Sequence, residues 1–345
     1  MTQVASRRSP ISVLPPRLPI PISETATWWA IFASGIGLLV LGAFTPRVVG
    51  EFGGAFIGLA FTWALAARTG GPKLLVAALA GAVGLLAIAS DLAALRTGAS
   101  IATAAIASIL GIVLTRPAVT FLGALRETLL ALVVPVVGGF AALGFAPEYA
   151  TFARYKWAVG AIAAVGLFWL VFRLGSGLHG LGRRGVVIVI GGAVALALVL
   201  AYAEFLRSYG SHEVVSWMQT RTQWMQAHLG AYPRPMVALI GVPALMLGVH
   251  MRSRRGQGWW VSAYGVAATA TLSSTINNAD VGLRESGLEL VYSLVVGVVI
   301  GAILIRADLA LSSAGGSRSA GRRVADVPPE KPGVRTEPAR NQPLL

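Results

Sequence analysis

The stretch ELVYSLVVGVVIGAILI, residues 289–305, decides the fold class of this chain. It carries one acidic residue, at its first position, and is apolar almost throughout. An α-helix rises about 1.5 Å per residue, so a run of this length approaches the roughly 30 Å needed to cross the hydrocarbon core of a bilayer. We therefore interpret residues 289–305 as a membrane span.

Comparable apolar runs precede this one along the chain. Of the 345 residues, 55% are hydrophobic and only 12% are charged, which lies outside the range of ordinary soluble domains. The sequence predicts an all-α fold, a polytopic transmembrane helix bundle of about ten spans. The other nine are expected at residues 28–45, 52–67, 74–90, 99–115, 128–146, 157–172, 185–203, 236–251 and 259–275.

The basic residues predict the orientation of this bundle. Ten alternating spans place twenty of the 28 Lys and Arg residues in the N-terminal arm, the loops on the same side and the C-terminal tail, and eight on the other side. Cytoplasmic segments carry such an excess, so we expect both termini in the cytoplasm and the bundle in the plasma membrane, the inner membrane of a bacterium. The net charge of +14 then reflects topology and predicts no nucleic-acid partner.

Three regions follow from this topology. Residues 1–27 form a cytoplasmic arm, residues 28–305 form the transmembrane bundle, and residues 306–345 form a basic, Pro-rich tail that we expect to be disordered. The loop at 204–235 should be external. Within it, an amphipathic helix is expected from a cap at Ser211 to about Leu229, with Trp217 and Trp224 at headgroup depth, as a simple anchor or as a lid.

Small residues and prolines occur inside several spans. Gly54 with Gly58, and Gly297 with Gly301, have the spacing that lets membrane helices approach closely. Pro135 and Pro243 each remove a backbone hydrogen bond in mid-span, and we expect each to kink its helix. Such kinks can mark a substrate site, although a tolerated membrane proline is the interpretation we favour.

One cytoplasmic loop combines glycines with basic side chains. Three of its glycines match G-x-G-x-x-G, but a membrane helix precedes them where a dinucleotide site needs a strand. The loop is a candidate site for an anion or a lipid headgroup, because exposed backbone N–H groups and guanidinium groups bind phosphate. We favour the simpler interpretation, a positive hairpin that contacts anionic lipid. The candidate residues are Arg173, Gly175, Gly177, His179, Gly180, Arg183 and Arg184.

The stretch from Gly177 to Gly185 also carries a resemblance. Together with Gly256-Gln257-Gly258-Trp259-Trp260-Val261, it resembles an uncharacterised family of multi-pass membrane proteins from actinobacteria. The resemblance covers most of the membrane region. It implies a multi-pass fold and carries no activity with it.

Polar side chains gather at the outer end of the ninth span and the start of the tenth. Some share a helical face, and acidic residues follow them, so together they are a candidate polar path open to the outside. The interpretation we favour is that the hydroxyls join membrane helices and that the acids suit a helix N-terminus. The residues are Thr271, Ser274, Asn278, Asp280, Glu285 and Glu289.

Catalytic and metal signatures are missing from the sequence. It contains no cysteine, no H-E-x-x-H, no G-x-S-x-G and no Walker A loop. His212, Glu213 and His228 match no standard metal spacing. We expect neither a cofactor nor a metal, and an enzyme is the less favoured class.

The best interpretation of function is permease-like transport of a small polar or amphipathic solute, which rests on architecture. One alternative is a non-transporting scaffold in envelope assembly, with the tail binding a protein partner. The other is a membrane protein that handles lipid phosphates at the glycine-arginine loop. The expected partners are membrane lipids, including anionic headgroups on the cytoplasmic face.

Overall fold

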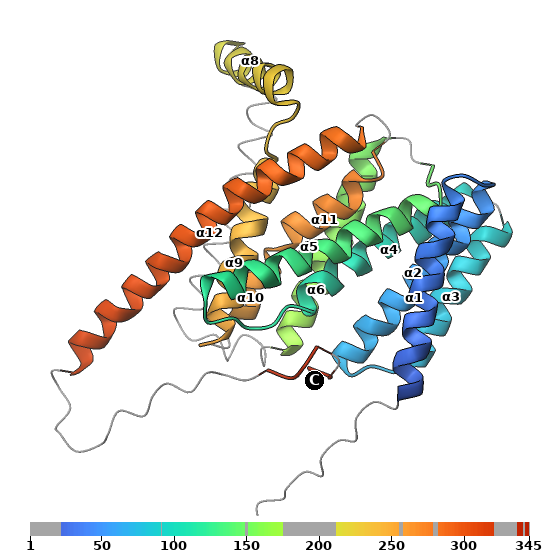
Figure 1. Cartoon of the computed structure of the whole chain (residues 1–345), viewed down its shortest axis with the longest axis horizontal. Helices are drawn as coiled ribbons and strands as arrows, with labels where there is room; N and C mark the ends of the chain where they lie inside the picture. Colours follow the sequence, from blue (N-terminus) through green and yellow to red (C-terminus); the bar gives the residue numbers. More distant parts are fainter. Residues whose placement is uncertain are drawn as a thin grey trace, which may run out of the picture.

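The structure of the chain, a computed structural model, describes residues 22–90, 92–148, 151–174, 212–254, 258–278, 282–320, 337–340 and 342–344. The described residues form helices joined by short turns and contain no strand (Figure 1). The helices are α1 (Ile22–Gly42), α2 (Arg47–Thr69), α3 (Lys73–Ser90), α4 (Ala93–Val113), α5 (Phe121–Gly144), α6 (Phe152–Leu174), α8 (His212–Leu229), the π-helix η2 (Met236–Gly241), α9 (Val242–Arg252), α10 (Gly258–Ala263), α11 (Val266–Thr275) and α12 (Leu283–Ala320).

Seven helices in the described part of the chain are long and apolar enough to cross a membrane. They are α1 to α6 and α12, each of which contains one of the expected spans or most of it. This all-helical bundle is compatible with an integral membrane protein. The number of ten spans and the orientation of the termini stay predictions.

The other three expected spans differ from these seven. The span at 185–203 lies outside the described residues. The span at 236–251 is the shorter apolar helix Met236–Arg252, which consists of η2 followed by α9. The span at 259–275 is interrupted at Tyr264 and Gly265, so that α10 and α11 are each too short to cross a bilayer alone.

The π-helical turn in Met236–Arg252 lies beside a proline. Pro243 is the second residue of α9, directly after the π-helical turn of η2. A proline lacks the N–H group of the helical ladder, and its ring crowds the carbonyl four residues earlier, so a widened turn accommodates it. Pro135, by contrast, is buried inside α5, which continues to Gly144. A Cβ on Gly111 of α4 would lie 2.4 Å from the carbonyl oxygen of Ala131, the group that Pro135 leaves without its helical donor.

The paired glycines allow helices to pack closely, as their spacing predicts. A Cβ on Gly54 would lie 2.5 Å from the carbonyl oxygen of Ala141 in α5. One on Gly297 would lie 2.6 Å from the Cβ of Val242 in α9. Both distances are shorter than any real Cβ contact, so these positions require glycine.

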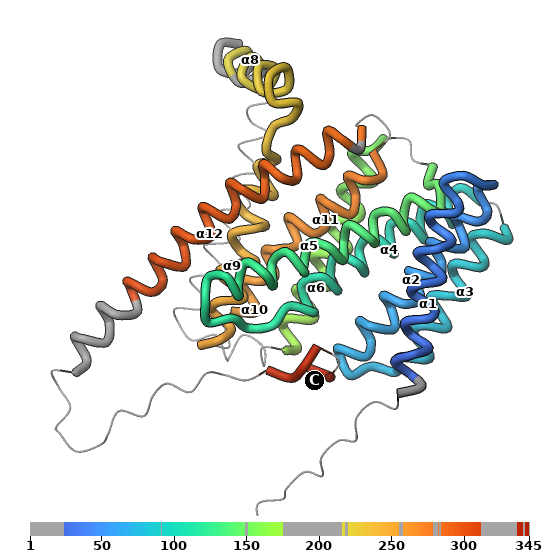
Figure 2. Tube along the Cα trace, viewed as in Figure 1, coloured from blue at the N-terminus to red at the C-terminus, as the bar shows by residue number. Residues whose placement is uncertain are grey.

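The two ends of the bundle can be defined by the helices that meet there. The C-terminal face consists of the last turns of α2, α4 and α9 with the first turns of α5 and α10, and the last described segment of the chain, Glu337–Leu344, lies against it (Figure 2). α1 begins at this same end of the bundle (Figure 1). The opposite face consists of the last turns of α5 and α11 with the first turns of α4 and α12.

Two segments outside the bundle core can be compared with expectation. The amphipathic helix exists as α8 and ends at Leu229, as predicted, and Trp217 and Trp224 are exposed on it; its cap at Ser211 lies outside the described residues. The tail that we expect from residue 306 begins as helix in the structure. Helix α12 continues to Ala320, and Glu337–Leu344 contacts the bundle. The disorder expected of the tail stays a prediction for residues 321–336, which are outside the described residues.

Candidate functional site

The helix Met236–Arg252 and the interrupted segment of α10 and α11 pack directly against each other. A Cβ on Gly241 at the end of η2 would lie 2.4 Å from the backbone nitrogen of Ala268 in α11. One on Gly265, in the break between α10 and α11, would lie 2.4 Å from the side chain of Leu245 in α9. Backbone therefore meets backbone at this crossing, which joins residues 236–252 and 258–275 into one unit.

Buried hydroxyl groups line this unit on the α10 and α11 side. Ser273 and Ser108 of α4 share a hydrogen bond of 2.9 Å between their Oγ atoms, and both are fully buried. Among the described residues, Ser262 Oγ and Thr269 Oγ1 are buried and have no hydrogen-bond partner. A buried hydroxyl without a partner costs about 1–3 kcal/mol, so it needs an explanation such as a ligand or water. We call Ser108, Ser262, Thr269 and Ser273 the polar seam.

An ion pair lies beside the last turn of α11, at the opposite face. Arg234, in the segment before η2, donates from Nε to Glu289 Oε2 over 2.6 Å, and its Nη1 donates to Thr275 Oγ1. The Arg234 backbone N–H donates to Ser293 Oγ over 2.7 Å. The Glu289 side chain is 5% exposed and that of Arg234 is 19% exposed. This Arg234 cluster joins η2, α11 and α12.

A second charged group lies at the C-terminal face and centres on Arg252. This residue is 1% exposed, and its guanidinium stacks 3.5 Å from the centroid of the Trp259 ring. Nη1 donates to Thr115 Oγ1 over 2.7 Å, and Nη2 donates to the Thr115 carbonyl over 2.9 Å. Nε and Nη2 form a two-pronged ion pair with the carboxylate of Glu337. This is the fork geometry that arginine offers to a carboxylate.

Arg68 of α2 completes this group, and we call Arg68 and Arg252 together the arginine cradle. Arg68 is also 1% exposed. Its Nη1 donates to the carbonyl of Ala339 over 2.5 Å and to that of Gln342 over 2.7 Å, and its Nε donates to the carbonyl of Val113 over 3.4 Å. Among the described residues, Arg68 Nη2 has no hydrogen-bond partner.

The segment Glu337–Leu344 is held at two further points. Arg340 forms an ion pair with Glu127 of α5. The backbone N–H of Leu344 donates to the carbonyl of Arg68 over 2.8 Å, at the end of α2. The chain end is therefore fixed to α2, α5 and α9 at once.

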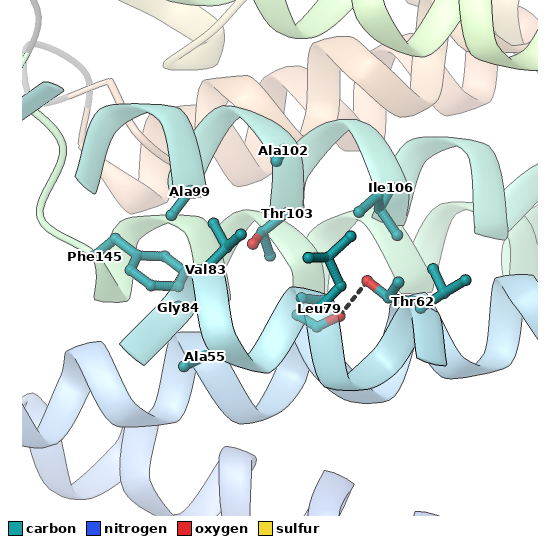
Figure 3. A pocket seen from close by; sticks show the side chains of 13 residues that line it. Ala55, Thr62, Leu79, Val83, Gly84, Ala99, Ala102, Thr103, Ile106 and Phe145 are labelled. Carbon is teal, nitrogen blue, oxygen red and sulfur yellow. Dashed lines mark hydrogen bonds between the residues drawn. The ribbon is translucent and has the colours of Figure 1, made fainter. Parts of the chain in front are cut away.

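A lateral crevice lies between α2, α3 and α4 (Figure 3). It is a cavity of about 240 Å³ with an almost wholly apolar lining. Thr103 from α4 and Thr62 from α2 are its hydroxyl-bearing residues, and Thr62 Oγ1 donates to the carbonyl of Gly58 over 2.7 Å. A pocket with this lining suits a hydrocarbon chain.

The structure describes five of the six residues of the predicted polar path. Thr271 and Ser274 are buried, but each hydroxyl donates to a carbonyl of its own helix, over 2.6 and 2.7 Å. Glu285 accepts a 3.3 Å hydrogen bond from Gln226 of α8, and Glu289 belongs to the Arg234 cluster. Asn278 is half-buried, and Asp280 lies outside the described residues.

The predicted glycine-arginine loop cannot be placed in the same way. Arg173 lies at the end of α6, with its guanidinium 5.2 Å from the centroid of the Trp169 ring. Gly175, Gly177, His179, Gly180, Arg183 and Arg184 lie outside the described residues. Within the part of the chain that the structure describes, no group of three or more His, Asp or Glu side chains is arranged to hold a metal ion.

Sequence reasoning missed the arginines that organise both ends. In the sequence, Arg68, Arg234 and Arg252 stand out only as members of the basic count that predicts orientation. Their hydrogen-bond partners come from 41 to 274 positions away in the sequence, so no local motif predicts these bonds. No family model, curated protein or solved structure matches this chain.

Proposed function

We propose that this chain is a permease-like membrane protein that moves a small polar solute along the polar seam. The observation that carries the proposal is the packing of the continuous helix Met236–Arg252, which contains a π-helical turn, against the interrupted segment of α10 and α11, which presents buried hydroxyl groups. Interrupted membrane helices are a recurrent site for solutes in transporters, because they free backbone and side-chain polar groups at depth.

The charged groups at the two faces support the same proposal. The Arg234 cluster lies at the opposite face, beside the end of α11, and the arginine cradle lies at the C-terminal face, beside the start of α10. Each contains one ion pair between segments that are distant in sequence. Ion pairs that can open and close are suitable gates at the ends of a path, because their partners lie on separate elements.

Cysteine accessibility tests this proposal, because the native chain has no cysteine. We expect Ser262→Cys, Thr269→Cys and Ser273→Cys to react with a small, charged, membrane-impermeant thiol reagent in vesicles. Ala163→Cys is the matched control, since Ala163 is fully buried within an apolar cluster. Ser216→Cys on exposed α8 is the positive control. If the three seam cysteines are as unreactive as the Ala163 position, water does not reach the seam and the proposal fails.

The lateral crevice favours a second candidate, a protein that handles a lipid. Its apolar lining and its position between α2, α3 and α4 suit an acyl chain. A photoactivatable lipid should then crosslink at Leu79 or Val83, and equal labelling of all lipid-facing positions would count against it. The scaffold alternative predicts that neither the seam nor the crevice takes a small molecule.

A further inference from the structure

We propose that the arginine cradle is a reversible carboxylate-binding site, filled by Glu337 of the chain's own C-terminal segment and open to a carboxylate from solution when that segment leaves. This goes beyond transport, because the cradle would bind whether or not the bundle moves a solute.

The bundle fixes Arg252 without help from the segment and contributes one hydrogen bond to Arg68. Thr115 and Trp259 fix the guanidinium of Arg252 through two hydrogen bonds and a stacked ring. The carbonyl of Val113 accepts from Arg68. Donors that are held in position before the ligand arrives lose little freedom on binding, so the site is preorganised.

The charge of the cradle requires an anion. Two guanidinium groups lie at one end of the bundle, and each residue is 1% exposed while the segment is bound. Isolated buried charges are costly, and a carboxylate that bonds to two guanidinium nitrogens compensates one of them with directed hydrogen bonds. The Glu337 side chain, 9% exposed, occupies this position on Arg252.

One donor of the cradle remains unused. Among the described residues, Nη2 of Arg68 is buried without a partner, and the carbonyls of the segment occupy Nη1 instead. Glu337 therefore satisfies the site only in part. A dicarboxylate offers oxygen atoms for both arginines.

The segment is a suitable reversible occupant. It is short, and apart from Glu337 and Arg340 its described contacts to the cradle and α2 are backbone hydrogen bonds. Ordering each backbone residue costs about 1–2 kcal/mol, which offsets much of what a few such contacts contribute. The entropy gained on release therefore opposes the ion pair of Glu337 and the contacts of Arg340 and Leu344.

The test compares the full chain with a chain that ends at Thr336, both in lipid nanodiscs. The probe is a fluorescent peptide of residues 337–345, EPARNQPLL, followed by anisotropy. We expect the shortened chain to bind the peptide and the full chain to bind it at least about tenfold more weakly, because its own segment fills the cradle. Equal binding to both chains would overturn the proposal.

Peptide variants test the chemistry without any risk to folding of the bundle. A Glu337→Gln peptide should bind about tenfold or more weakly, since it loses the charge-assisted fork. A Pro338→Ala peptide is the matched control, because Pro338 is exposed and the variant keeps its backbone carbonyl. Equal binding of the Glu337→Gln and native peptides would show that the cradle does not recognise the carboxylate.

Competition identifies the ligand class. Succinate should displace the native peptide from the shortened chain, and inorganic phosphate at the same concentration should displace less of it. If succinate fails to displace a peptide that does bind, the cradle docks its own segment alone and the proposal is wrong. Stronger displacement by phosphate would assign the cradle to phosphate and overturn the carboxylate class.

Discussion

Glu289 in α12 forms a buried ion pair with Arg234, a residue that precedes η2 by two positions. The pair joins the residues just before η2 to α12, the longest helix that the structure describes. Ser293, one turn further along α12, accepts from the backbone of the same arginine. The start of η2 is therefore held against α12 by an ion pair and a hydrogen bond as well as by apolar packing.

Glu289→Gln should destabilise the bundle. The change leaves Arg234 without its counter-ion in a mostly buried site, and loss of one partner of a buried pair costs about 3 kcal/mol or more. A fall in the melting temperature of the purified protein in detergent measures this. Glu285→Gln is the control, because Glu285 is less buried and holds one hydrogen bond to Gln226. Equal melting temperatures for both variants would contradict a structural role for the pair.

Gly241→Ala should destabilise the crossing of η2 with α11. The added Cβ meets the backbone of Ala268 at 2.4 Å, and backbone cannot move aside as a side chain can. Overpacking of this kind costs about 1–3 kcal/mol. Gly160→Ala in α6 is the control, since nothing lies within 4 Å of its added Cβ and alanine favours a helix. Thermal unfolding of both variants distinguishes them, and similar loss in both would count against the close crossing.

Trp217 and Trp224 on α8 should anchor this helix at the membrane surface. Their side chains are 61% and 51% exposed in the structure, which a membrane interface would explain. Replacing both with serine should raise hydrogen exchange of the α8 amides in nanodiscs. Gln223→Ser is the control, because this exposed polar residue should not enter the interface. Fast exchange of α8 in the native chain would rule out a stable interfacial helix.

The two ends of the chain should lie on the same side of the membrane. A cysteine at Ser216 in α8 should react with an impermeant reagent from outside whole cells, and one at Ser317 in α12 should be protected until the cells are broken. This pattern follows from the basic-residue count and from α1 beginning at the C-terminal face. The reverse pattern would contradict the orientation.

The helices themselves could be predicted from the sequence, because length and hydropathy determine which runs can span a bilayer. The close helix packing at Gly54 and Gly297 could also be predicted, because it depends on a local spacing of glycines. The interruption at Tyr264 and Gly265 was not expected, because the run 259–275 is apolar or weakly polar throughout and hydropathy does not register a change of backbone path.

The candidate site was less predictable than the fold. Thr271 and Ser274 share a helical face with Asn278, yet their hydroxyls bond to their own helix, while Ser262 and Thr269 do not. That difference depends on which neighbours crowd each hydroxyl. The partners of Arg68 lie at the far end of the chain, in a segment whose composition resembles a disordered tail. Composition cannot show a docking contact that a few residues make.

Solute movement through Ser273→Cys protein in liposomes tests the proposed path most directly. A panel of isotope-labelled small polar solutes would be followed into the vesicles before and after treatment with a thiol reagent, with the cysteine-free native chain as control. The account predicts that at least one solute enters faster than into empty liposomes, and that the reagent stops its entry in the variant and not in the native chain. Entry no faster than into empty liposomes for the whole panel, or entry that the modified cysteine leaves unchanged, would contradict a solute path along the polar seam.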